Sequence, residues 1–296
     1  MLQSLSSRLS PNHEQLSIVN DEIKRTDAGI YGEQYIFQLL KEQGYLVITD
    51  ITVHQQQIDI LVFHRSYCAL FEVKNIKGQI QFTDSPRQML RKKEDGTLQI
   101  FSSPFAQIEN NLRAIQSYFN VQKIKLPLYS AVVFPFHNAT FNEMNFKVPI
   151  LIGKDILNYL SKLDSLEPIY SARQIKSMIK HLQEISRPFT RYPLCERYNL
   201  KAHEIMVGCR CENCNALPMV RAYASWRCPA CGLETKDAHI RALQEYACLI
   251  SDTITLREAM RFLVIDNRYL ARRMLLQAGS TRTGRTRSTK YTLKRF

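Results

Sequence analysis

Hydrophobic residues recur at helical spacing in two segments of the first half of the chain. In residues 29–43, GIYGEQYIFQLLKEQ, the side chains of Ile36 and Phe37 fall on one face. Glu33 shares that face because it precedes them by three and four positions. In residues 105–119, FAQIENNLRAIQSYF, apolar side chains again recur every three or four positions. We predict one helix in each segment.

Short runs of β-branched and aromatic residues, separated by polar breaks, predict strands. These runs are YLVITDITV at 45–53, QIDILVF at 57–63, YCALFEV at 67–73 and LYSAVVF at 128–134. The order of helix, three strands, helix and strand predicts an α/β fold in which helices flank a mixed sheet. A further helix is predicted at 172–185, ARQIKSMIKHLQEI.

Helical spacing returns three times near the C-terminal end. The predicted helices are AHIRALQEYACLIS at 238–251, a second beginning near TLREAMRFL at 255–263, and a third from RYLARRMLLQ to Gly279. Thr255 and Glu258 fit a capping box at the second helix. The break VIDN has the length of a helix-turn-helix turn, and STRTGRTRSTKYTLKRF suits a β-wing. This order resembles a winged helix-turn-helix domain; the alternative is a solvated basic tail without a fold.

Three charged residues interrupt the second and third predicted strands. If Arg65 and Ser66 form a two-residue hairpin turn, the numbers of opposed residues sum to 131, so that Asp59 faces Glu72. Lys74 shares the face of Glu72 because side chains alternate along a strand. Opposed carboxylates on a buried sheet repel unless a proton or a cation neutralises them, and a hard divalent ion such as magnesium serves this purpose. Lys74 would then orient a water nucleophile or stabilise phosphoryl charge.

The spacing leaves structural alternatives open for these residues. Asp59 and Glu72 could lie at strand ends in solvent, or Lys74 could simply pair with one of them. Glu33 could cap its own helix, since an acid in the first turn favours the macrodipole. Gln107 could be a solvated helix residue.

The same residues carry a resemblance to the PD-(D/E)XK nuclease superfamily, in the pattern of Asp59 followed by Glu72-Val73-Lys74 and preceded by a helix with Glu33. More narrowly, the resemblance is to the nuclease-related NERD domain over residues 25–135. The motifs that carry it are G-x-x-G-E at 29–33, Q-I-D at 57–59, F-E-V-K-N at 71–75 with Gly78, and P-x-x-Q at 104–107. The literal Pro-Asp is absent because Ile58 precedes Asp59.

The resemblance implies a restriction-endonuclease-like fold with a Mg²⁺ or Mn²⁺ ion at its active site. Glu33, Asp59 and Glu72 would surround the metal, with Asp59 and Glu72 as its ligands. Lys74 would be the catalytic lysine, and Gln107 an accessory polar group at the same site.

Five of the eight cysteines fall within 23 residues. C-E-N-C at 211–214 and C-P-A-C-G at 228–232 have the spacing of two zinc knuckles, and we expect Cys211, Cys214, Cys228 and Cys231 to hold a structural Zn²⁺ ion in a zinc ribbon. Cys209 is a spare thiol that could replace Cys211. Tyr223 and Trp226 are candidates for nucleic-acid contact, although Trp226 could equally be the core of the ribbon.

The net charge of +13 is unevenly distributed along the chain. Residues 1–165 carry 17 Lys and Arg against 16 Asp and Glu, whereas 166–236 carry 11 against 6 and 237–296 carry 12 against 5. We therefore expect a polyanion to bind to the C-terminal part of the chain. The expected DNA contacts on the third helix and the wing are Arg268, Arg272, Arg273, Arg282, Arg285, Arg287 and Lys290.

Four domains are expected: a nuclease-like domain at 1–165, a helical linker at 166–204, a zinc ribbon at 205–236 and a winged-helix-like domain at 237–296. With no run of the roughly 20 apolar residues that span a bilayer and no signal-peptide pattern, we expect a cytoplasmic protein without membrane contact.

Together, these features predict a metal-dependent deoxyribonuclease that its C-terminal modules target to DNA. The alternative is a DNA-binding regulatory or maintenance protein whose nuclease-like domain is inactive. RNA binding through the ribbon has less support because the sequence shows no stacking platform. A double-strand cut would call for a homodimer.

Overall fold

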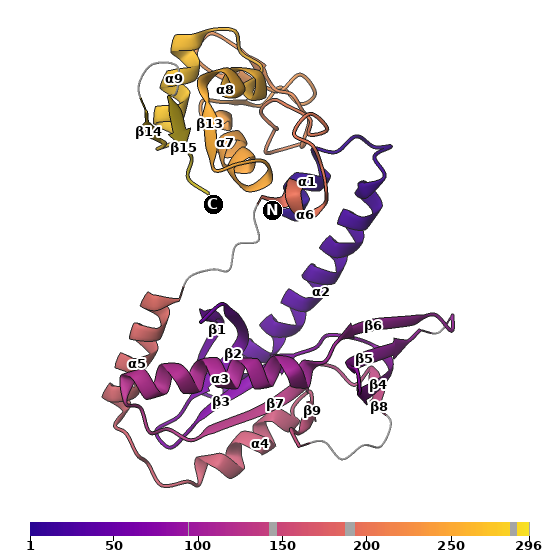
Figure 1. Ribbon diagram of the computed structural model, residues 1–296, viewed down its shortest axis with the longest axis vertical. Coiled ribbons are helices and arrows are strands. Elements are labelled where there is room, and N and C mark those ends of the chain that lie inside the picture. The colour runs from indigo at the N-terminus through magenta and orange to yellow at the C-terminus, as the bar shows by residue number, and fades with distance from the viewer. Residues whose placement is uncertain (94, 142–146, 187–192, 285–288, 296) are drawn as a thin grey trace. The chain divides into compact units, whose positions relative to one another are not determined.

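The computed structural model describes residues 1–93, 95–141, 147–186, 193–284 and 289–295 (Figure 1). The chain forms two compact units. We call residues 25–189 the central unit, and residues 1–24 together with 190–296 the terminal unit. These units differ from the four expected domains, because the N-terminal residues pack with the C-terminal part of the chain. None of the described helices is long and apolar enough to cross a membrane.

The central unit is built on a five-stranded mixed sheet. The strands follow the order β1-β2-β3-β7-β9, with bounds Leu46–Val53, Gln56–Phe63, Cys68–Val73, Leu128–Phe134 and Ile150–Ile152. The first three strands pair antiparallel, while β3, β7 and β9 are parallel. Parallel neighbours require a crossover, and helix α3, Pro104–Gln122, lies in the crossover between β3 and β7. The four predicted strands are all present.

Helices cover both faces of this sheet, as predicted. Alternate strand residues enter different cores: Leu70 and Val132 pack in the core that α3 and α5, Ala172–Ile185, complete. Phe71 and Val133 pack in the core of α2, Gln15–Glu42, and α4, Asp155–Asp164. Both faces are thus apolar, which explains the nearly continuous hydrophobic runs in the sequence.

Helix α2 begins at Gln15, well before the predicted start at residue 29. Polar residues in its first half, such as Asn20, Asp21 and Glu22, hide the helical pattern. Glu33 therefore lies far inside the helix, and the alternative that it caps the first turn is wrong. Helix α5 has the predicted bounds, and a capping box formed by Ser171 and Gln174 sets its start.

A second sheet of the central unit has no counterpart in the prediction. Its strands follow the order β6-β5-β4-β8, with bounds Leu98–Ser102, Arg87–Lys92, Gly78–Asp84 and Ala139–Phe141. Polar residues alternate with Ile80 and Phe82 along β4, so the sequence has no continuous apolar run here. Gly78, which the sequence motif includes, begins β4 with φ +107°, a conformation that favours glycine.

The terminal unit contains three short strands of a ribbon and a helical part. The ribbon strands are β10, Val220–Arg221, β11, Trp226–Arg227, and β12, Glu234–Thr235. Helices α7, Ala238–Leu249, α8, Leu256–Leu263, and α9, Arg268–Gln277, match the three predicted helices, and Thr255 and Glu258 form the predicted capping box. Strands β13, Thr253–Thr255, β15, Lys290–Thr292, and β14, Thr281–Thr283, form a small antiparallel sheet in that order.

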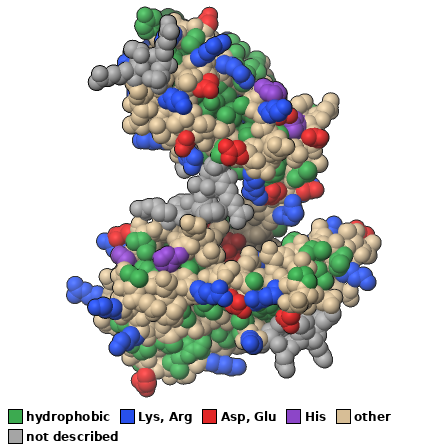
Figure 2. Space-filling view, in the orientation of Figure 1, with side chains coloured by type: hydrophobic (Ala, Val, Ile, Leu, Met, Phe, Trp, Pro, Cys, Tyr) green, Lys and Arg blue, Asp and Glu red, His purple; other side chains and the backbone are tan. Residues whose placement is uncertain are grey.

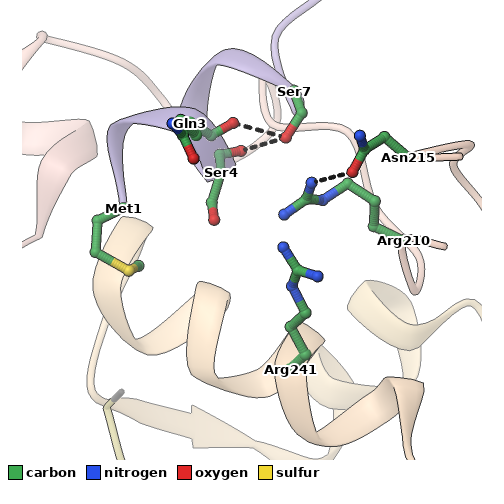
Figure 3. Close-up of a pocket in the computed structure, with 7 residues that line it drawn as sticks. All are labelled: Met1, Gln3, Ser4, Ser7, Arg210, Asn215 and Arg241. Atoms are coloured by element: carbon green, nitrogen blue, oxygen red, sulfur yellow. Dashed lines mark hydrogen bonds between the residues drawn. The ribbon is translucent and has the colours of Figure 1, made fainter. Parts of the chain in front are cut away.

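A buried ionic cluster joins the N-terminal residues to the rest of the terminal unit. Arg8 and Arg210 each donate to one carboxylate oxygen of Glu245, at 2.8 and 2.7 Å, and the three side chains are almost fully buried. Arg8 also donates to the carbonyls of Met206 and Gly208. Arg241 donates to Glu245 from 3.3 Å. The guanidinium groups of Arg210 and Arg241 lie beside a cavity next to α1, Leu2–Ser6 (Figure 3).

Candidate active site and metal centre

The hairpin of β2 and β3 has the predicted register. Ile60 pairs with Phe71 and Phe63 with Cys68, and the backbone N–H of His64 donates to the carbonyl of Tyr67 at 2.9 Å across the two-residue turn. One step beyond the paired residues, the same register places Asp59 opposite Glu72. The backbone N–H of Val73 donates to Oδ2 of Asp59 at 2.9 Å. The hairpin therefore brings both carboxylates to the α3 face of the sheet.

Glu72 is buried, with 3% of its surface exposed. Its Oε1 accepts a hydrogen bond from Nζ of Lys74 at 2.6 Å, since residues two apart share a face. Its Oε2 lies 3.5 Å from Nδ2 of Asn111 on α3, which also donates to the carbonyl of Gln57. The alternative of a solvated Glu72 is therefore wrong, whereas pairing with Lys74 does occur.

Helix α2 brings Glu33 close to these acids through a glycine contact. A Cβ atom on Gly32 would lie 2.7 Å from Cβ of Asn75 and 3.1 Å from Cγ of Pro135, so only glycine permits this approach. Nδ2 of Asn75 also donates to the carbonyl of Ala28 at 2.7 Å. The G-x-x-G-E motif thus has a physical basis, because the glycine next to Glu33 sets the distance between helix and sheet.

The electrostatics of the site show an excess of negative charge. Burial and the charge of Asp59 raise the pKa of Glu33 to about 7. Burial raises the pKa of Glu72 to about 7 against the opposing effect of Lys74, and burial also raises the pKa of Asp59. One lysine does not neutralise three carboxylates, so a proton or a metal cation is needed.

The donor set fits a hard divalent cation. Carboxylate oxygens are the ligands that such ions prefer, and the buried positions of Asp59 and Glu72 make the uncompensated charge costly. The structure thus brings together four of the five predicted catalytic residues: Glu33, Asp59, Glu72 and Lys74.

Gln107 is placed differently from the other candidates. It is half-buried on α3, and its Oε1 is buried without a hydrogen-bond partner among the described residues. Its side chain is therefore not that of a fully solvated helix residue. The residue that contacts Glu72 from this helix is Asn111, one turn further along.

Sequence reasoning missed two residues near the acids. Asn111 follows Gln107 by four positions, a helical spacing that would have placed both on one face. Asp50 has φ +52° within β1 and accepts a hydrogen bond from Gln57, and its charge raises the pKa of Glu33. No pattern in the sequence indicates that Asp50 lies near the site.

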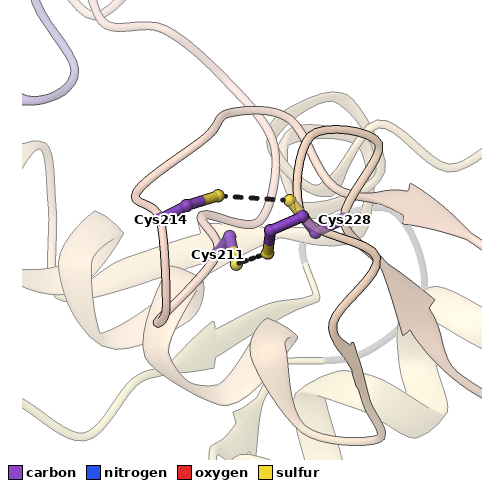
Figure 4. A group of neighbouring side chains, drawn as sticks. Cys211, Cys214 and Cys228 are labelled. Carbon is purple, nitrogen blue, oxygen red and sulfur yellow. Dashed lines mark hydrogen bonds between the residues drawn. The ribbon is translucent and has the colours of Figure 1, made fainter.

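The four predicted zinc ligands form a compact group (Figure 4). Their sulfur atoms all lie within 4.8 Å of one another, with Cys211 and Cys231 3.6 Å apart and Cys214 and Cys228 3.4 Å apart. Sulfurs about 2.3 Å from a tetrahedral zinc ion lie about 3.8 Å from each other, so the spacing fits zinc. Cys209 does not belong to this group and is buried in the core of the terminal unit.

The aromatic residues of the ribbon differ in their surroundings. Trp226 is fully buried and forms part of the core of the terminal unit. This agrees with the alternative that Trp226 is a core residue of the ribbon and not a nucleic-acid contact. Tyr223 is fully exposed.

The described DNA-contact candidates are all exposed. They are Arg268, Arg272 and Arg273 on α9, Arg282 on β14 and Lys290 on β15. None of these five forms an ion pair with a carboxylate in the part of the chain that the structure describes. Arg285 and Arg287 lie outside the described residues. In the view of Figure 2, Lys and Arg side chains occur on the surface of both units.

Comparison with known protein families gives a match within the central unit. Residues 28–135 match the family model of the nuclease-related domain, NERD. The matched segment contains all five residues predicted for catalysis and also Asn111. The chain therefore has a nuclease-related domain, and the four cysteines outside it are compatible with a zinc ribbon. No curated protein and no solved structure matches the chain.

Proposed function

We propose, from the nuclease-related domain at residues 28–135, that the protein hydrolyses phosphodiester bonds of DNA with a divalent metal ion. The observation that carries this proposal is the group of three acids around Lys74, with two acids whose pKa is raised to about 7. Three carboxylates in a buried site repel one another, and a bound metal cation would neutralise this charge.

We assign a role in the proposed reaction to each residue of the candidate site. Asp59 and Glu72, with Glu33 beside them, would hold Mg²⁺ or Mn²⁺. When bound, such an ion supplies an activated water and neutralises charge on the phosphate. Lys74 orients the water or stabilises the developing phosphoryl charge, and Asn111 positions Glu72. Gln107, whose Oε1 has no hydrogen-bond partner among the described residues, is an accessory hydrogen-bond acceptor.

The terminal unit supplies the affinity for DNA in this proposal. A structural Zn²⁺ ion on the four cysteines would stabilise the ribbon without an open coordination position. The order of α7, β13, α8, α9 and the β14–β15 hairpin supports a winged helix-turn-helix, in which α9 enters the major groove and the hairpin contacts the backbone. Cleavage of both strands of a duplex would require two copies of the chain.

A second candidate function follows from the ion pair of Lys74. Because Nζ of Lys74 is bound to Glu72 at 2.6 Å, the pair could be structural, and the protein would then bind DNA for regulation or maintenance without cutting it.

Cleavage assays with supercoiled and linear DNA in magnesium, manganese or chelator test the proposal. We expect metal-dependent cutting by the wild type and its loss in Glu72→Gln, because the charge that holds the ion is removed. Glu109→Gln is the matched control, since Glu109 is a surface acid of α3 that pairs with Arg87. Tight DNA binding by all variants without cutting in any condition would instead support the second function.

A further inference from the structure

A cavity of about 430 Å³ lies within the terminal unit between the ribbon and helix α9. The residues relevant to its chemistry come from three elements and the loops beside them: Arg221, Tyr223, Lys236, His239, Arg273 and Gln277. Its walls combine the zinc-ribbon segment with the proposed DNA-reading helix. The cavity therefore lies where a ligand would contact both modules.

The cavity is electropositive and has unused hydrogen-bond donors. Arg221, Lys236 and Arg273 line it, and no carboxylate does so among the described residues. Nε and Nη1 of Arg221 are buried and have no hydrogen-bond partner in the described part of the chain. Burial and then the charge of Arg273 lower the pKa of Arg221, so the two guanidinium groups repel each other. An anion with several oxygens, such as a phosphate group, would relieve that repulsion and accept hydrogen bonds from the guanidinium groups that line the cavity.

An aromatic contact holds the arginine in place at this cavity. The guanidinium carbon of Arg221 lies 5.2 Å from the centre of the Trp226 ring, and Trp226 is fully buried. The Arg221 guanidinium thus packs against the core of the ribbon.

An exposed aromatic side chain, Tyr223, also lines the cavity. Tyr223 is fully exposed, although aromatic side chains usually bury most of their surface. An exposed aromatic ring next to a basic cavity offers a face on which a nucleic-acid base can stack.

We propose that this cavity binds one nucleotide of a single DNA strand, with the phosphate on Arg221, Lys236 and Arg273 and the base against Tyr223. The inference rests on the proposed function in taking DNA as the partner, but it concerns a different substrate form, because a base stacked on Tyr223 must leave the duplex. The larger cavity of the terminal unit, beside Arg210 and Arg241, is less suited to an anion (Figure 3). There Arg210 already donates to Glu245 and Asn215, and Arg241 also donates to Glu245.

The test is fluorescence anisotropy of the full chain with a labelled oligothymidylate of about 12 nucleotides, a length within the usual site sizes for single strands. We expect Tyr223→Ala to weaken binding by about tenfold, because a stacked base contributes that much affinity. Lys236→Gln should weaken binding by about threefold or more, through loss of one phosphate contact. Tyr223→Phe, which keeps the ring, should bind as the wild type does.

A matched control makes the result specific to the cavity. Lys201→Gln removes another exposed lysine, and Lys201 does not line the cavity. It should leave single-strand binding unchanged. Equal binding by wild type and Tyr223→Ala, or equal losses in Lys236→Gln and Lys201→Gln, would overturn the inference.

The two proposals fail in different ways. Binding and cutting of duplex DNA, together with no affinity for the single strand, would refute the nucleotide cavity and leave the nuclease intact. Single-strand binding that depends on Tyr223, together with no metal-dependent cutting, would refute the nuclease and support the cavity.

Discussion

Individual charged residues in this protein are buried in two contrasting ways. In the central unit, three acids surround one lysine, and burial raises the pKa of the acids. In the terminal unit, one acid, Glu245, is surrounded by arginines that satisfy both of its oxygens. The first arrangement has an excess of negative charge, which suits the binding of a metal cation. In the second, the arginines neutralise the carboxylate, which suits a structural role.

Glu245→Gln should destabilise the terminal unit by about 3–5 kcal/mol, since it leaves Arg8 and Arg210 buried without a counter-charge. Urea unfolding followed by circular dichroism measures the change. Glu196→Gln is the control, because Glu196 is exposed, and it should have almost no effect. A Glu245→Gln protein as stable as the wild type would show that the cluster contributes no net stability.

The same carboxylate predicts a pH dependence. Burial opposes ionisation of Glu245, but Arg8 and Arg210 outweigh it and hold the pKa below its ordinary value of 4.5. A depressed pKa gives stability that is present above pH 4.5 and is lost as the pH falls through the pKa of the folded state. The difference in unfolding free energy between wild type and Glu245→Gln should therefore shrink below pH 4.5. A difference that stays constant with pH would contradict this assignment.

At the scale of elements, the contact of α2 with the sheet decides where Glu33 lies. Gly32 allows the helix to approach Asn75 and Pro135, whereas Gly29 has only the side chain of Glu33 near its Cβ position, at 4.0 Å. The two glycines of one motif thus have different physical roles.

Gly32→Ala should cost about 1–3 kcal/mol in stability, because the added methyl group forces α2 away from the sheet. DNA cleavage should fall by up to about a hundredfold as Glu33 moves from its position. Thermal unfolding and cleavage rates measure the two effects. Gly29→Ala is the matched control and should stabilise the helix by up to about 1 kcal/mol. Equal effects of both substitutions would rule out a special role for Gly32.

The cysteine group is the second element with a testable role. Cys211, Cys228 and Trp226 belong to the core of the terminal unit, so loss of zinc should unfold more than the ribbon. A zinc chelator, or Cys228→Ser, should lower the unfolding temperature of the terminal unit and leave the transition of the central unit in place. Calorimetry and a zinc assay measure this, and identical transitions with and without chelator would argue against a structural metal.

The whole molecule combines a nuclease-related domain of nearly balanced charge with basic C-terminal modules. If the basic modules contact the phosphates, DNA binding should weaken as the salt concentration rises. Because each phosphate contact contributes about 0.9 to the slope of log K against log salt, Arg268→Gln with Arg272→Gln should reduce that slope by about 1.8. Titrations of duplex DNA at several salt concentrations measure it. An unchanged slope would place the DNA-binding surface elsewhere on the molecule.

The sequence by itself determined the local elements and the local site geometry. The β2–β3 register, the helix of residues 172–185 and the capping box of Thr255 follow from side-chain alternation, helical spacing and hydrogen bonds between near neighbours. For the same reason, a short turn was enough to predict that Asp59 faces Glu72, and two short cysteine motifs were enough to predict a compact sulfur group.

Only the tertiary structure decided which distant residues meet. Arg8 and Glu245 are 237 positions apart, and Asn111 reaches Glu72 across 39 positions, separations over which periodicity carries no information. The second sheet and the early start of α2 were missed because their polar residues hide the local pattern, and only packing in three dimensions stabilises them. Interactions between near neighbours in the sequence thus specify helices and strands. Burial and charge pairing between distant residues specify the two units. They also determine the positions of Glu33 and Asn111 and form the cavity beside α9.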